Sequence, residues 1–167
     1  ANGTIAIGSD ALNALTSGVA NTALGYRSLK TNQAGDYNTA VGHQALETFN
    51  SADIGRNTAV GINSLNALDS GVENTVIGSF AGDAMAVGES YNTVVGADAM
   101  GSVDEGTAGG DVDYNVAIGA NALVGGDFAG NDRQLQGNIA IGTYSLTSTA
   151  ANAQTGTIAI GHQSLTA

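Results

Sequence analysis

Residues 38–46 read Asn-Thr-Ala-Val-Gly-His-Gln-Ala-Leu, and variants of this nine-residue core recur along the whole chain, always with glycine as the fifth residue. The nine cores span residues 4–12, 21–29, 38–46, 57–65, 74–82, 92–100, 115–123, 138–146 and 157–165. Successive core glycines are separated by 17, 17, 19, 17, 18, 23, 23 and 19 residues. A fixed core with connections of variable length is typical of a solenoid. We therefore predict a single repeat domain over residues 1–167, a mainly β protein that forms a parallel β-solenoid of nine coils of 17–23 residues.

The second, third and fourth positions of each core predict a short β-strand. The second position is Thr, Val or Ile, and the fourth is Ile, Leu or Val throughout. These two positions are mostly β-branched and lie two residues apart, so they belong on one face of a strand. The third position is Ala in seven cores, with Val76 and Val94 in the other two. We expect the large aliphatic residues to point into the coil and the alanines to point outward.

The alanine column leads to a prediction about assembly. Its members are Ala6, Ala23, Ala40, Ala59, Ala117, Ala140 and Ala159. A stripe of small apolar residues exposed to water would favour aggregation. Packed against the same stripe of two partner chains, it would let three sheets approach closely. We therefore expect this column to be the contact face of a homotrimer.

Asparagine opens seven consecutive cores, and glycine is invariant at the fifth position. The asparagines are Asn21, Asn38, Asn57, Asn74, Asn92, Asn115 and Asn138. Equivalent residues in a parallel stack lie about 4.8 Å apart, so these amides can form a hydrogen-bonded ladder; the alternative is that asparagine only favours the turn before each strand. The glycines are Gly8, Gly25, Gly42, Gly61, Gly78, Gly96, Gly119, Gly142 and Gly161. We expect them at the opposite corner, where φ is positive or two backbones approach closely.

The segment after each glycine is less decisive. The ninth core position is Leu in seven cores, Met100 in one and Gly82 in one, and we expect this side chain to point into the coil. A second short strand is one interpretation of the segment. A short helical turn is the other, because Leu65 and Leu68 are three residues apart.

The composition excludes several classes of function. Lys and Arg number 4 against 15 Asp and Glu, a formal net charge of −11, so we expect no nucleic-acid partner. Cysteine is absent, which excludes disulfides and cysteine nucleophiles. No apolar run approaches the about 20 residues of a membrane-spanning helix, so we expect no membrane insertion. The two histidines, His43 and His162, occupy the same core position six coils apart, too far to share a site. We expect neither a catalytic residue nor a bound cofactor.

Two groups of residues outside the cores are candidate binding sites. Asp111 and Asp113 follow two glycines, an arrangement that resembles glycine-aspartate calcium turns; the alternative is a solvated acidic edge. Tyr37, Tyr91 and Tyr114 each directly precede a core asparagine. An exposed aromatic edge is a candidate surface for a cell-surface glycan or receptor. Ring stacking that braces the longest loops is the alternative.

The cores resemble two related kinds of repeat. The NTAVG and TIAIG strands resemble the head repeats of trimeric autotransporter adhesins of the YadA type. The longer unit NTAVGHQAL is similar to repeats of phage tail fibres. The resemblance implies a parallel β-roll or β-helix with three chains side by side, located on a virion or on an extracellular cell surface. The coils of this chain are longer than those of the YadA-type head.

Taken together, these features favour a non-enzymatic structural and adhesive segment of a surface fibre, a spacer and display for host or surface attachment. The alternative is a self-assembling extracellular filament subunit with head-to-tail stacking of coils, because the first and last cores are alike. A carbohydrate-active β-helix enzyme is less favoured, since the strands carry no convincing carboxylate pair. An ice-binding protein is also less favoured, because the threonine column gives way to Val116, Ile139 and Ile158.

Overall fold

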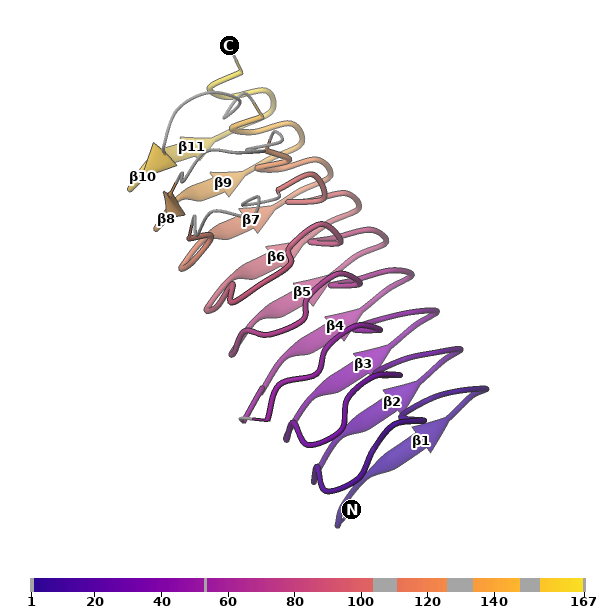
Figure 1. The fold of residues 1–167 in the computed structure, drawn as a ribbon. Helices are drawn as coiled ribbons and strands as arrows, with labels where there is room; N and C mark the ends of the chain where they lie inside the picture. The colour runs from indigo at the N-terminus through magenta and orange to yellow at the C-terminus, as the bar shows by residue number, and fades with distance from the viewer. Residues whose placement is uncertain (1, 53, 104–110, 126–133, 148–153, 167) are drawn as a thin grey trace.

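The structure, a computed structural model, describes residues 2–52, 54–103, 111–125, 134–147 and 154–166. This part of the chain is all-β, contains no helix and forms a parallel β-solenoid (Figure 1). Its main sheet has nine parallel strands in the order β1-β2-β3-β4-β5-β6-β7-β9-β11. The strands are β1 (Ile5–Ile7), β2 (Thr22–Leu24), β3 (Thr39–Val41), β4 (Thr58–Val60), β5 (Thr75–Ile77), β6 (Thr93–Val95), β7 (Val116–Ile118), β9 (Ile139–Ile141) and β11 (Ile158–Ile160).

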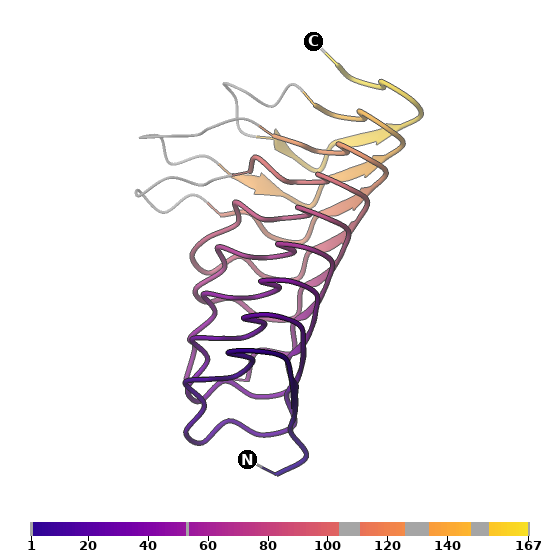
Figure 2. The same cartoon turned by 90° about the vertical axis from the view of Figure 1, so that its right-hand side faces the viewer.

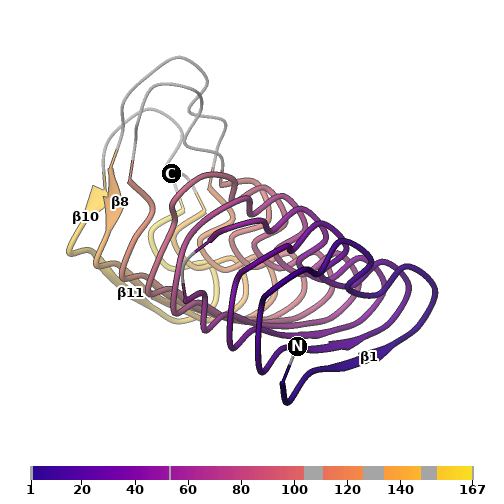
Figure 3. The same cartoon turned by 60° about the horizontal axis from the view of Figure 1, so that its bottom comes forward.

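Each core contributes one three-residue strand to the sheet, and the two ends of the chain lie at opposite ends of the stack (Figures 1 and 2). A second, two-stranded parallel sheet pairs β8 (Leu135–Gln136) with β10 (Gln154–Thr155). Viewed more nearly along the stack, the coils overlay one another (Figure 3). The parallel β-solenoid predicted from the cores is confirmed.

The strands pair in register, so each core position forms a straight column. Thr22 pairs with Thr39, Ala23 with Ala40, and Leu24 with Val41, and the same register continues along the sheet. Successive side chains of a strand point to opposite faces. The second and fourth positions therefore line one face of the sheet, and the third position lines the other.

The two faces are the reverse of what we expected. Apart from Ala6 in the first strand, the alanines of the third position are buried within a single chain: Ala23, Ala40, Ala59, Ala117 and Ala140 at 0% exposure, and Ala159 at 2%. The fourth-position residues point outward, with exposed fractions of 58% for Ile7 and 66% for Ile160. The prediction that the alanine column is the contact face of a trimer is therefore wrong. These alanines belong to the core of the chain itself.

The physical reason is the narrow interior of each coil. The leucine at the ninth position fills it, since Leu29, Leu46, Leu65 and Leu123 are fully buried as the sequence predicts. The facing strand then has room only for a small side chain. The two coils with a larger third residue support this, because neither has leucine at the ninth position: Val76 is combined with Gly82, and Val94 with the unbranched Met100. A Cβ added to Gly82 would lie 3.7 Å from Val76 Cγ1 and 2.9 Å from Met85 Sδ.

Neither a second strand nor a helical turn follows the core glycine. Instead, the seventh and ninth core residues are in the left-handed region; Asn63 and Leu65, for example, have φ of 53° and 50°. Their N–H groups hydrogen-bond to the two neighbouring coils. The Asn63 N–H donates to the His43 carbonyl of the preceding coil at 2.9 Å, and the Leu65 N–H donates to the Ala81 carbonyl of the following coil at 3.1 Å. The turn segment is therefore joined to its neighbours by backbone hydrogen bonds as the strands are, although it is not a strand.

The core glycines occupy the corner directly after the sheet; all nine have positive φ, and all but Gly161 approach the backbone of the next coil closely. Their φ angles run from 126° at Gly142 to 149° at Gly78. A Cβ added to Gly78 would lie 2.2 Å from the carbonyl oxygen of Gly96 in the next coil. Only glycine lets the backbones approach so closely.

We expect Gly78→Ala to lower the free energy of unfolding by about 3 kcal/mol or more, because it combines an unfavourable φ with a clash against backbone. Gly161→Ala is the matched control: φ is 129°, but the added Cβ would meet nothing closer than Ser164 Cβ at 4.0 Å. The control carries only the conformational cost of about 1–2 kcal/mol. Chemical denaturation measures both, and equal losses would contradict the role of close backbone approach.

Candidate functional site

The seven core asparagines form one continuous hydrogen-bonded ladder inside the chain. Asn74 is representative: its Nδ2 donates to Asn57 Oδ1 at 3.0 Å and to the Glu89 carbonyl at 2.7 Å. Its Oδ1 accepts from the N–H and the Nδ2 of Asn92, at 3.0 and 3.1 Å. Asn138 continues the ladder to the last core, because its Oδ1 accepts the Thr157 N–H at 3.0 Å. All seven side chains are fully buried.

This ladder uses the full hydrogen-bonding capacity of an amide. Each interior amide has two donated and two accepted hydrogen bonds, which is what one NH₂ group and one carbonyl oxygen can form. A buried polar group that is satisfied in this way stabilises a unique register, since any shift would leave it unpaired. The asparagines therefore hold the coils together and leave no free group for a ligand.

The three predicted surface tyrosines do not form one continuous site. Tyr91 and Tyr114 lie in adjacent coils with their rings stacked, 4.9 Å between centroids and 1° between planes. Tyr37 lies apart from them, separated by the coils that carry Arg56 and Glu73. Those two side chains form an ion pair of 2.9 Å. All three tyrosines are exposed, by 52% for Tyr37, 43% for Tyr91 and 59% for Tyr114.

The two candidate calcium ligands are engaged in hydrogen bonds that link coils. Asp113 Oδ1 accepts the Ser90 N–H at 2.7 Å, and Asp111 Oδ2 accepts from Gln136 Nε2 at 3.1 Å. Asp36, at the position equivalent to Asp113, likewise accepts the Val19 N–H at 2.7 Å. Among the described residues, no three metal-ligating side chains gather into a group that could hold an ion. Gly109 and Gly110, the glycines of the predicted calcium turn, lie outside the described residues.

Burial is the main cause of the shifted pKa of Asp113. Desolvation raises the pKa of Asp113 above its usual value, the hydrogen bond from Ser90 opposes the shift, and the charge of Asp111 adds to it. Burial in the same way raises the pKa of Asp83, with a further contribution from the charge of Asp98. The Asp113 carboxylate thus connects two coils by accepting the Ser90 N–H, while burial disfavours its charged form.

The histidines lie at the surface. His43 is exposed, and its ring centroid is 5.0 Å from that of Tyr26. His162 is also exposed.

Over the described ranges, no helix is long and apolar enough to cross a bilayer.

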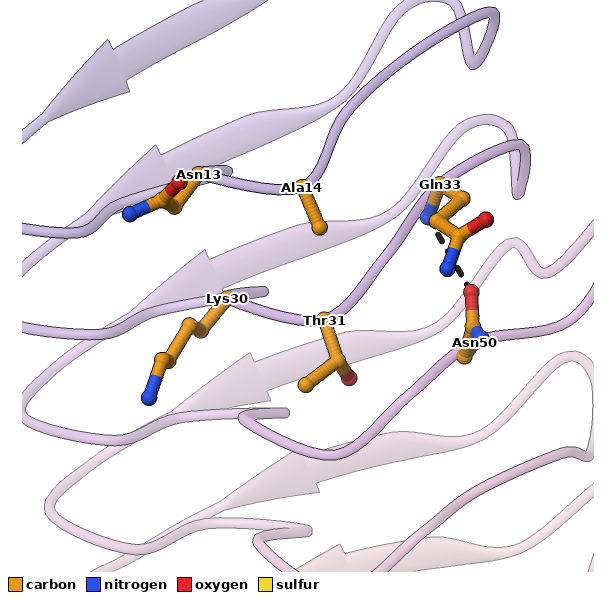
Figure 4. A pocket seen from close by; sticks show the side chains of 6 residues that line it. All are labelled: Asn13, Ala14, Lys30, Thr31, Gln33 and Asn50. Atoms are coloured by element: carbon orange, nitrogen blue, oxygen red, sulfur yellow. Dashed lines mark hydrogen bonds between the residues drawn. The ribbon is translucent and has the colours of Figure 1, made fainter.

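Sequence reasoning missed an open groove of about 430 Å³ on the turn side of the first coils. Its lining residues are Asn13, Ala14, Lys30, Thr31, Gln33 and Asn50 (Figure 4). Four of its six lining residues have neutral polar side chains, and the Asn50 side-chain oxygen accepts the Gln33 N–H at 3.2 Å. Lys30 lies 3.9 Å from Glu47. The sequence feature that could have indicated this groove is the recurrence of polar residues at equivalent positions after the core glycine, such as Gln33 and Asn50.

We expect Asn74→Ala to lower the free energy of unfolding by about 3–5 kcal/mol, because each buried group left without its partner costs about 1–3 kcal/mol. The groups affected are Asn57 Oδ1, the Glu89 carbonyl and the two donors of Asn92. Asn50→Ala removes an amide at an exposed position and is the control, with an expected loss below about 1 kcal/mol. Urea denaturation measures both, and a small loss for Asn74→Ala would contradict the structural role of the ladder.

We expect acidification to raise the contribution of Asp113 to the stability of the chain as the pH falls through its raised pKa, and Asp113→Asn to lack this gain. A carboxyl whose pKa is raised by folding binds its proton more tightly in the folded state. Its contribution to stability therefore grows as the pH falls through the raised pKa and is complete below the unfolded value near 3.8. The asparagine oxygen can still accept the Ser90 N–H, so the variant should be at least as stable as the wild type at neutral pH. Thermal melts of both proteins, from neutral pH down to the unfolded value near 3.8, test this, and a variant that is less stable at neutral pH would contradict it.

Comparisons with protein-family models, with curated proteins and with solved structures give no match to this chain. The assignment of a function therefore rests on its own residues and on how the solenoid arranges them.

Proposed function

We propose that this chain is a non-enzymatic structural segment of a surface fibre, assembled as a homotrimer and serving as a spacer and display in attachment to a host or surface. The single observation that carries the proposal is an uncharged, outward-facing side of the main sheet. We call it the outer sheet face, and it consists of the second and fourth core positions. Its residues are Ile5, Ile7, Thr22, Leu24, Thr39, Val41, Thr58, Val60, Thr75, Ile77, Thr93, Val95, Val116, Ile118, Ile139, Ile141, Ile158 and Ile160.

The outer sheet face has the features of a protein interface. Thirteen of its 18 residues are aliphatic, five are threonine and none is charged, in a chain with a formal net charge of −11. Nine strands at about 4.8 Å spacing give it a length of about 38 Å. Large aliphatic side chains remain exposed along it, from Ile7 (58%) to Ile160 (66%). A contiguous exposed apolar patch of this kind marks an interaction site.

A second copy of the same chain fits this face best. Acidic copies repel one another through their charged edges, and the outer sheet face is where that repulsion is weakest. Closed symmetry lets the same long stripe meet its equivalents around one axis. The number of three chains comes from the resemblance of the cores to YadA-type and tail-fibre repeats.

The interior supports a role as a stiff spacer. Backbone hydrogen bonds join each coil to the next through the strands and through the turn segment. The asparagine ladder adds buried contacts that resist sliding between coils.

The test compares two substitutions of the same type, Ile77→Glu and Ile62→Glu. Ile77 lies on the outer sheet face and is 42% exposed, whereas Ile62 follows the corner glycine and is 51% exposed. We expect wild-type and Ile62→Glu chains to be trimers. We expect Ile77→Glu to be a folded monomer, since like charges brought together at an interface cost several kcal/mol. Light scattering gives the mass, and circular dichroism confirms that the fold is kept.

Other results would contradict the proposal in distinguishable ways. Monomeric wild-type chains would remove the trimer, and dimers would keep the face but not the number of chains. Particles that lengthen with concentration would favour head-to-tail filaments. Monomers that reshape growing ice crystals would favour ice binding. Threonines and large aliphatic residues lie together on this outward face, although we expected the aliphatic residues to point inward.

A further inference from the structure

The residue directly before each core asparagine or threonine forms a column along one edge of the main sheet, here called the edge column. Its members are Gly3, Ala20, Tyr37, Arg56, Glu73, Tyr91, Tyr114, Gly137 and Gly156. All nine have φ in the left-handed region, between 50° at Arg56 and 70° at Gly3. The backbone therefore imposes the same conformation on every residue of the column.

Tyr114 is the last residue of the edge column with a side chain, because the next two positions are glycines. One face of its ring is covered by Tyr91, and the planes of the two rings are parallel within 1°. The next two positions are Gly137 and Gly156. A Cβ added to Gly137 would meet only Gly156 N, at 3.9 Å, and a Cβ added to Gly156 would meet nothing within 4 Å. Among the described residues, the edge column thus leaves the second face of the Tyr114 ring uncovered over about two coil spacings, or about 10 Å.

The backbone at Tyr91 and Tyr114 has a left-handed conformation that glycine adopts more readily than tyrosine. Tyr91 and Tyr114 have φ of 62° and 60°, and glycine occupies the same position in three other coils. A bulky residue in this region carries strain that glycine avoids. Both rings are exposed, so burial does not offset that strain. Arg56 and Glu73 have the same backbone conformation, so the solenoid imposes the φ and only the side chain distinguishes the tyrosine positions.

Polar groups of the kinds that bind sugar hydroxyls lie on the coil of Tyr114 and on the coils that follow it. The Gly137 N–H donates to the Asp113 carbonyl at 3.0 Å, which places Gln136 beside the coil of Tyr114. The Gln136 amide in turn donates to the Asp111 carboxylate at 3.1 Å. Thr155 is exposed and pairs with Gln136 in the β8–β10 sheet. A carboxylate, an amide and a hydroxyl therefore lie on the coil of Tyr114 and on the two coils that follow it.

We propose that Tyr114, Gly137 and Gly156 form a slot that binds a neutral pyranose. The sugar stacks its face of axial C–H groups on the open side of the Tyr114 ring, and its hydroxyls bond to Asp111 and Gln136. The charge of Asp111 and Asp113 selects against acidic sugars. This inference rests on the proposed function in one respect: it names the class of ligand to which the fibre segment would attach.

The probes are methyl β-galactoside, methyl β-glucoside, the neutral disaccharide of N-acetylglucosamine, and sialic acid as the acidic comparison. Because the chain has 5 tyrosines and no tryptophan, tyrosine fluorescence reports on the slot, and saturation-transfer NMR reports which sugar protons face the ring. We expect at least one neutral probe to bind with a millimolar dissociation constant through its axial C–H face. Sialic acid should bind more weakly.

Four variants locate the binding. Tyr114→Ala should weaken it by at least about tenfold, the loss typical of removing an aromatic anchor. Tyr114→Phe keeps the stacking surface and should stay within about threefold of the wild type. Gly137→Asn fills the slot with a residue that tolerates left-handed φ and should abolish binding without unfolding the chain. Tyr37→Ala removes an exposed tyrosine of the same column elsewhere and should change nothing.

No binding of any neutral probe, or equal binding by Tyr114→Ala, would overturn the proposal. Ile77→Glu separates it from the trimer. Sugar binding by that variant, whatever the assembly state, supports the slot, whereas a trimeric wild type that binds no sugar overturns the slot and leaves the fibre segment standing.

Discussion

In-register backbone hydrogen bonding between coils is the constraint on which the rest of this structure depends. It acts in the three-residue strands, where Thr58 pairs with Thr75 and Ala59 with Val76. It also acts in the turn, where the Leu65 N–H donates to the Ala81 carbonyl. Since every coil is held by the one before and the one after, equivalent residues must adopt the same backbone conformation. This is why leucine at the ninth position adopts a left-handed φ that it would avoid in an isolated turn.

The same constraint gives each column of side chains a fixed volume. The third and ninth positions share one narrow interior, so Ala and Leu combine in most coils. In the coil of Val76, the ninth residue is Gly82, and Met85 lies against it from three residues further on. The exception in the leucine column is therefore compensated within its own coil. A sequence that varies in this way keeps the packing density of the interior while it changes the identity of the residues.

The sequence was sufficient to predict the columns but not the direction in which two of them point. The period, the strand positions, the asparagine ladder and the corner glycines all follow from residues that recur at fixed core positions. Strand alternation shows that Thr58 and Val60 share a face, but both faces of these strands are apolar, so hydrophobicity did not identify the inner one. Size was the better guide, since a coil already filled by Leu65 admits only a small residue opposite it. The positive φ angles after each glycine could not be anticipated, because the hydrogen bonds that impose them join residues of different coils.

These constraints separate stability from recognition. The interior columns and the asparagine ladder are saturated with packing and hydrogen bonds, which leaves them no role in binding. The outward positions contribute little to those contacts, so their side chains can change from coil to coil without loss of the fold. The edge column illustrates the point, because one backbone conformation carries glycine, alanine, an Arg56–Glu73 ion pair and a Tyr91–Tyr114 stack in different coils. The outer sheet face varies far less, because it contains only threonine and aliphatic residues along its whole length. A surface in which residues vary freely is suited to display, whereas a surface that stays uncharged over nine strands is suited to the contact between copies that we propose.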